Sequence, residues 1–145
     1  MSDRIKRTKP VLHAKSRLVD EKRAALAAAL RAANAARVEQ LNAEDAWEKR
    51  VNALATGQYE TIAEHLEARA HLESLKRAAL AAADRAALAI RAEQAARESL
   101  IVAERDLKKI EAWRDGIIEA ERAAEARVER LASDELAARM FQTRR

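Results

Sequence analysis

The stretch that decides the fold runs from Ala68 to Ala89 and reads ARAHLESLKRAALAAADRAALA. It contains neither glycine nor proline, and its apolar residues recur three and four positions apart among charged residues. That spacing places the apolar side chains on one stripe of a helix. The stretch therefore predicts a long amphipathic helix rather than a strand.

The heptad that starts in this stretch continues through the second half of the chain. Every seventh residue from position 68 is apolar: Ala68, Leu75, Ala82, Ala89, Ala96, Ala103, Ile110, Ile117, Ala124, Leu131 and Ala138. A companion seam comprises Leu72, Ala79, Ala86, Leu100, Leu107 and Val128, and it is interrupted by Glu93, Arg114, Glu121 and Glu135. Apolar positions sustained over so many heptads are typical of a coiled coil.

Composition supports the same fold class. The chain has 145 residues, of which 37 are alanine and only 34 are larger apolar residues, and it has two glycines and one proline. Alanine alone cannot fill a compact core, and the β-branched and aromatic residues that strands prefer are scarce. The absence of cysteine excludes disulfides and thiolate chemistry and is compatible with the cytoplasm. No apolar run approaches the 20 or so residues of a membrane-spanning helix.

The positions of the helix breakers predict two helices. Residues 1–10 form a basic arm that ends at Pro10, and helix formers then run from Val11 to Leu54, with a seam of Leu12, Val19, Leu26, Ala33, Gln40, Trp47 and Leu54. Breakers cluster around Gly57, and helix formers resume as far as Met140. We expect an all-α fold in which two long helices form an antiparallel coiled-coil hairpin over residues 11–140, with its tip near 55–61, a longer second helix and a basic tail at 141–145.

This pairing leaves part of the second helix without a partner. Counting outward from Gly57 puts residue 12 beside roughly residue 102, so about the last 35 residues should overhang, with Ile110, Ile117 and Leu131 still carrying the seam. An apolar seam needs cover, which a second copy, another protein or the N-terminal segment could provide.

Charge and aromatic residues suggest where partners bind. Residues 1–23 carry a net charge of +5 within a chain of +4, and Arg139, Arg144 and Arg145 add a basic end at the other terminus. Such an end either docks on an acidic surface or is simply a solvated terminus. The aromatic residues Trp47, Tyr59 and Trp113 either pack in the seams or act as anchors for a partner.

The residues offer little support for chemistry. Two glycines 59 residues apart cannot form a phosphate-binding loop. His65 and His71 are six apart, which does not place them on one helix face, so no metal or cofactor is expected. Acidic residues through the body and the lack of a stacking platform disfavour nucleic acid. We therefore expect a protein that is not an enzyme.

The C-terminal half resembles a known family. Residues 108–113 read KKIEAW and residues 134–139 read DELAAR, a pattern similar to the end of the small stalk proteins of type III secretion systems, the FliJ/YscO (SctO) family. Members are close to this length, and their hairpin tip falls where Gly57 lies here. The high alanine content favours an injectisome member of the Hrp type over a flagellar one.

The resemblance implies a function and partners. Family members are antiparallel coiled coils of the cytoplasm whose terminal end enters the pore of the hexameric export ATPase and stimulates hydrolysis. The opposite end reaches the cytoplasmic domain of the export-gate membrane protein, and some members bind secretion chaperones. Carried onto this chain, the resemblance implies that a set of basic residues binds the ATPase and that Trp47 and Tyr59 bind the gate. The ATPase set is Arg4, Lys6, Arg7, Lys9, Arg139, Arg144 and Arg145.

Three alternatives stay open from the sequence. The overhang could join copies of the chain into a homo-oligomeric scaffold, or the hairpin could act as an adaptor that binds secretion chaperones. An amphipathic helix lying on a membrane is a third class, although an alanine-rich seam is weakly hydrophobic for that role.

Overall fold

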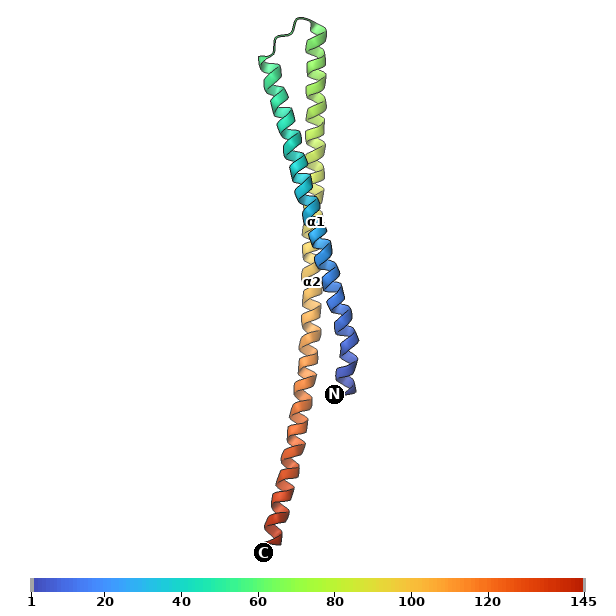
Figure 1. Ribbon diagram of the computed structural model, residues 1–145, viewed down its shortest axis with the longest axis vertical. Helices are drawn as coiled ribbons and strands as arrows, with labels where there is room; N and C mark the ends of the chain where they lie inside the picture. The colour runs from blue at the N-terminus through green and yellow to red at the C-terminus, as the bar shows by residue number, and fades with distance from the viewer. Residues whose placement is uncertain (1, 145) are drawn as a thin grey trace. The chain divides into compact units, whose positions relative to one another are not determined.

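The computed structural model describes residues 2–144 and is all-α (Figure 1). Helix α1 spans Asp3–Thr56, 54 residues, and helix α2 spans Ile62–Thr143, 82 residues. The two long helices, the longer second helix and the turn near Gly57 are as predicted. The helices divide into two compact units, one formed by Met1–Asp20 with Val102–Arg145 and the other by Glu21–Ile101.

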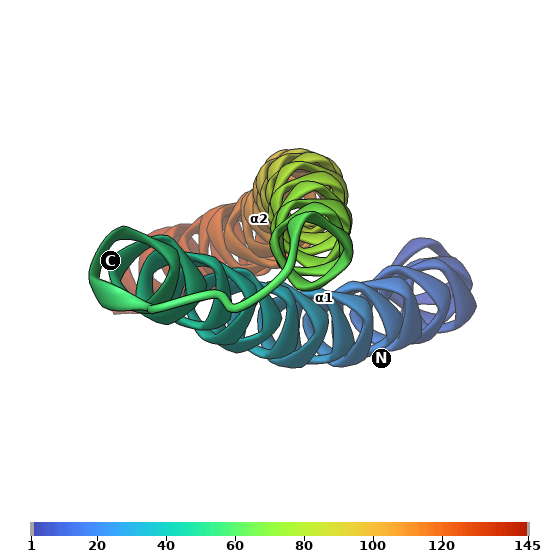
Figure 2. The same cartoon turned by 90° about the horizontal axis from the view of Figure 1, so that it is seen from above.

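The unit formed by Glu21–Ile101 is a helical hairpin with a core of small side chains. Figure 2 shows the short connection that joins the end of α1 to the start of α2. The buried apolar residues are all alanines: Ala33, Ala68, Ala79, Ala82 and Ala86. Alanine at these positions allows two helices to approach closely, so side chains such as Leu80 and Leu88 stay exposed on the outer faces.

The start of α2 is capped by its own sequence. The Thr61 hydroxyl accepts a hydrogen bond from the Glu64 backbone N–H at 3.2 Å, and the Glu64 carboxylate accepts one from the Glu60 N–H at 3.2 Å. A threonine followed three residues later by a glutamate satisfies N–H groups that the first turn of a helix leaves without partners. The cap therefore specifies where the chain re-enters helix after the turn.

The polar interruption at Glu93 is part of this hairpin's core. The Glu93 carboxylate lies 2.8 Å from Arg97 on its own helix and 3.8 Å from Arg37 across the hairpin, and its side chain is only 11% exposed. A buried ion pair contributes little net stability compared with an apolar residue of similar size, but it penalises any register that separates the partners. Glu93 therefore specifies how α1 and α2 align in this unit.

In the other unit, residues 3–20 of α1 lie antiparallel to α2. The buried residues here are Thr8, Val19, Ala103 and Ile117. The Ser2 hydroxyl accepts a hydrogen bond from the Ile5 N–H at 3.3 Å, as a helix N-cap does, and donates one to the Glu121 carboxylate of α2. The first turn of α1 is thus fixed both to its own cap and to α2.

Two expectations from the sequence are wrong in this unit. The helix begins at Asp3 rather than Val11, so most of the predicted basic arm is helical and Pro10 lies inside α1. As a result, α1 reaches further along α2 than expected, and Ile117 is buried and Ile110 half-buried instead of overhanging. The N-terminal segment, one of the three covers that the sequence left open, thus covers Ile110 and Ile117, and Leu131 stays exposed.

The two glycines should respond to substitution in opposite directions. A Cβ on Gly57 would lie 2.8 Å from the Ala53 carbonyl oxygen and 3.0 Å from the Tyr59 hydroxyl, whereas one on Gly116 would meet nothing within 4 Å. We predict that Gly57→Ala lowers the free energy of unfolding by about 1–3 kcal/mol through crowding. Gly116→Ala should raise it by about 1 kcal/mol because alanine is the better helix former. Urea unfolding followed by circular dichroism measures both, and equal effects of the two substitutions would contradict the turn geometry.

The Glu93 cluster predicts a second contrast. Glu93→Leu should leave the free energy of unfolding within about 1 kcal/mol of the wild type, because an apolar side chain replaces a desolvated charge in the seam. The double substitution Arg37→Ala and Arg97→Ala should lower it by about 1–3 kcal/mol, because it leaves the carboxylate without partners. Urea titrations of both variants test this, and a larger loss for Glu93→Leu than for the double variant would contradict it.

Candidate protein-binding surfaces

The C-terminal extension of α2, residues 122–144, is the main surface without cover. All of its residues are exposed, and it begins directly after Glu121, where the Ser2 hydroxyl meets α2. In Figure 1 this red end of α2 continues past the N-terminus of α1, which belongs to the same unit. At 1.5 Å per residue the extension is about 35 Å long.

The extension carries an apolar stripe among charged residues. Its exposed large apolar side chains are Val128, Leu131, Leu136, Met140 and Phe141. Val128 and Leu131 continue the two seams that α1 covers closer to the turn. Arg130 and Asp134, and Glu135 and Arg139, are four residues apart, a spacing that supports an isolated helix in water. A helix of this kind suits a partner that surrounds it or offers it a groove.

The predicted basic residues fall into two groups. Arg4, Lys6, Arg7 and Lys9 are exposed on the first turns of α1, and Arg139 and Arg144 are exposed near the end of α2. Arg145 lies outside the described residues. Arg139 is 18 residues beyond Glu121, or about 27 Å along the helix, so the two groups are not one continuous patch.

The solvent-facing charges of the first group are largely unpaired. Lys6 lies 3.8 Å from Asp3, with side chains that are 64% and 87% exposed respectively. An ion pair this exposed is worth at most about 1 kcal/mol. The first group is therefore available to an acidic partner.

The predicted gate-binding residues both belong to the hairpin unit and are half-buried. The Tyr59 ring packs edge-to-face on His65, with centroids 5.4 Å apart and an interplanar angle of 69°. Part of each aromatic surface is thus used inside the unit. The turn also exposes Ile62 and Leu66, at 81% and 59%, which the sequence reasoning did not select. Their position directly after the helix breakers around Gly57 could have indicated that they lie exposed at the turn.

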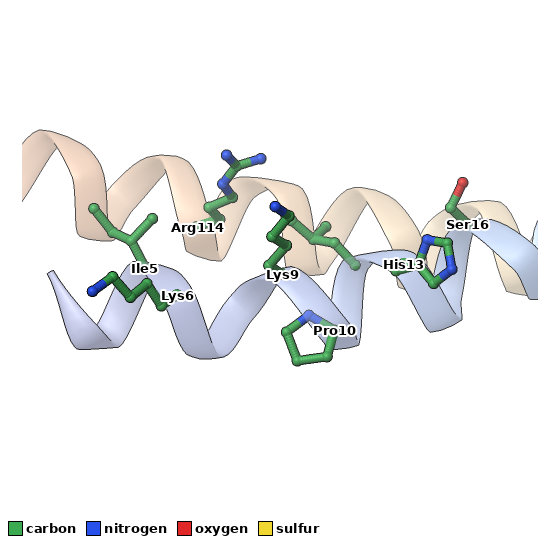
Figure 3. A pocket seen from close by; sticks show the side chains of 8 residues that line it. Ile5, Lys6, Lys9, Pro10, His13, Ser16 and Arg114 are labelled. Carbon is green, nitrogen blue, oxygen red and sulfur yellow. The ribbon is translucent and has the colours of Figure 1, made fainter. Parts of the chain in front are cut away.

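Open hollows lie where α1 pairs with α2 in the terminal unit, and the sequence did not predict them; two of them are lined by basic residues of the first group. One, of about 460 Å³, is lined by residues that include Arg4, Gly116 and the half-exposed Trp113. The other, of about 730 Å³, is lined by Ile5, Lys6, Lys9, Pro10, Leu12, His13, Ser16 and Arg114 (Figure 3). The sequence signals for these hollows were the interruption of the seam at Arg114 and the glycine at 116.

Two classes of site find no support in the part of the chain that the structure describes. Residues 2–144 contain no group of three His, Asp or Glu side chains placed to hold a metal ion. Within the same residues, neither helix has a segment long and apolar enough to cross a bilayer.

Comparison with known proteins leaves the function to be argued from these surfaces. The chain matches no protein-family model, no curated protein and no solved structure.

Proposed function

We propose that this chain is a non-enzymatic central stalk of a type III secretion export apparatus. In this role the C-terminal extension enters the pore of the hexameric export ATPase, stimulates hydrolysis and links the ATPase to the export gate. The observation that carries the proposal is the extension itself, 23 exposed residues of which the first 22 are helical, which follow directly on a paired region. The KKIEAW and DELAAR segments give the family resemblance, and the second of them lies within this extension.

The shape and chemistry of the extension suit a pore. A single helix with side chains is about 10–12 Å wide, narrower than a helix pair, so it can enter where the paired region cannot. Val128 and Leu131 offer apolar contact, and Arg139 and Arg144 lead with positive charge. The first basic group, Arg4, Lys6, Arg7 and Lys9, would face the rim of the same pore, where electrostatic steering speeds association.

The turn of the hairpin is the surface proposed for the gate. Ile62 and Leu66 are exposed there beside the half-buried Tyr59. Exposed apolar residues next to an aromatic ring form the kind of cluster that dominates protein interfaces. Trp47, further back on α1, would support this surface through packing. The cytoplasmic side of the inner membrane is the location that this function requires.

A homo-oligomeric scaffold is the second candidate because the same apolar stripe could pair with a second copy. The stalk requires that the stripe be free when the ATPase is absent, whereas the scaffold requires that it be occupied. Sedimentation at nanomolar concentration separates them. A monomer supports the stalk, and a stable dimer supports the scaffold.

The stalk proposal predicts the outcome of an ATPase titration. Adding the protein to the cognate export ATPase should raise ATP hydrolysis until each hexamer has bound a single copy. The double substitution Val128→Asp and Leu131→Asp should raise the half-saturating concentration by about tenfold or more, because it places charge on the apolar stripe. The assay is steady-state phosphate release.

The chain offers a matched control for this titration. Leu80 and Leu88 are as exposed as Val128 and Leu131, and they lie in the hairpin unit. Leu80→Asp with Leu88→Asp should therefore stimulate like the wild type. Equal loss in both variants, or no stimulation by a folded wild type, would contradict the role of the extension.

A further inference from the structure

Four polar residues interrupt the companion seam of α2, and the structure gives three of them a clear environment. Glu93 forms ion pairs with Arg37 and Arg97. Glu121 accepts a hydrogen bond from the Ser2 hydroxyl, and Glu135 is exposed on the extension. Arg114 differs from these. It is half-buried beside α1, and none of the ion pairs that residues 2–144 form includes it.

Arg114 lines the larger hollow together with other cations. Figure 3 shows Lys6, Lys9 and His13 on α1 and Arg114 on α2 around this hollow, with the Lys9 side chain rising from α1 toward the α2 ribbon. None of the described residues that line it is an aspartate or a glutamate. A bound carboxylate could therefore pair with these cations without competing with an acidic side chain of the lining.

Part of the lining of the hollow is apolar. Ile5, Pro10 and Leu12 line it alongside the cations. The hollow has a volume of about 730 Å³ and is open to solvent, so a surface side chain of a partner can enter it. A lining with both apolar and cationic side chains recognises a ligand that carries apolar groups and carboxylates on the same face.

The net charge of the surrounding region supports this reading. Residues 2–16 and 107–118 together carry eight basic and three acidic side chains, a net charge of +5 in a chain of +4. Three of these eight basic side chains, Lys6, Lys9 and Arg114, line the hollow itself. Charge complementarity calls for an acidic partner.

We infer that this hollow, defined by Ile5, Lys6, Lys9, Pro10, Leu12, His13, Ser16 and Arg114, is a docking site for an acidic amphipathic helix of a partner protein. Apolar side chains one turn apart on that helix enter over Ile5, Pro10 and Leu12, and flanking carboxylates meet Lys6, Lys9 and Arg114. The inference does not rest on the C-terminal extension, and it gives Lys6 and Lys9, which the proposed function places at the rim of the pore, a second partner. It concerns the side of the paired helices rather than the exposed end of α2.

A protein helix suits the hollow better than a lipid or a nucleic acid. The apolar lining is small, three side chains on successive turns of α1, which matches the side chains that one face of a helix presents better than it matches a bilayer surface. Stacking of nucleic-acid bases needs exposed aromatic rings, and the lining contains no Phe, Tyr or Trp.

The test uses a fluorescein-labelled 18-residue peptide designed as a helix, with leucines along one face and glutamates on both sides of them. Fluorescence anisotropy with the full-length protein should show saturable binding that weakens as salt is raised. A peptide with lysine in place of every glutamate should bind at least about tenfold more weakly, and so should one with serine in place of every leucine. The two peptides test the charge and the apolar contact separately.

Protein variants locate the binding. Lys6→Glu with Lys9→Glu, both at exposed positions, should weaken binding of the acidic peptide by about tenfold or more. Lys76→Glu with Arg77→Glu makes the same charge change on exposed residues of the hairpin unit and should bind like the wild type.

Several results would overturn the inference. One is that the acidic peptide does not bind. Another is that the serine-substituted peptide binds as tightly as the acidic peptide. A third is that the two charge-reversed variants lose the same amount of affinity for the acidic peptide. Displacement of the peptide by phosphatidylglycerol vesicles, with the same dependence on Lys6 and Lys9, would assign the site to a lipid surface instead. Stimulation of the export ATPase is measured separately, so failure here leaves the proposed function standing.

Discussion

The cover that the first turns of α1 give to α2 is the constraint on which the terminal unit depends. Ile117 is buried because α1 begins at Asp3, and the Ser2 hydroxyl donates a hydrogen bond to α2 at Glu121. Beyond Glu121, every residue that the structure describes, as far as Arg144, is exposed. The length and the N-cap of α1 thus determine where along α2 the part paired with α1 ends and the exposed extension begins.

The hairpin unit is held by a different balance of forces. Its buried apolar residues are alanines, each of which removes little apolar surface from water. Such a seam gives weak preference for any single alignment, because one alanine fills the space of another. Glu93 with Arg37 and Arg97 supplies the missing specificity. A polar residue in this seam therefore helps to specify the alignment of the two helices.

The sequence predicted the architecture because the heptad from Ala68 and the cluster of breakers at Gly57 are strong signals. It placed the start of α1 wrongly at Val11 because proline normally ends or begins a helix. Inside a helix proline costs about 3 kcal/mol. Here the Ser2 cap and the packing of Thr8 against α2 offset that cost, and both depend on tertiary contacts that the local sequence does not show.

The candidate surfaces were predicted in part. The exposed position of Leu131 follows from the unequal lengths of the two helices, and that of the basic residues follows from their charge. That Ile110 and Ile117 are covered, and that Arg114 and Lys9 line one hollow, depends on the register between helices more than 100 residues apart in the chain. No pattern local to either segment encodes that register.

Amide hydrogen exchange along α2 tests the central claim most directly. The account predicts slow exchange at residues 103–121, where α1 lies alongside, and a sharp rise in rate from residue 122 to residue 144 in the isolated protein. Protection that continues undiminished to the end of α2 would show that a second copy covers the extension. Fast exchange at Ile117 would show that the first turns of α1 do not cover α2.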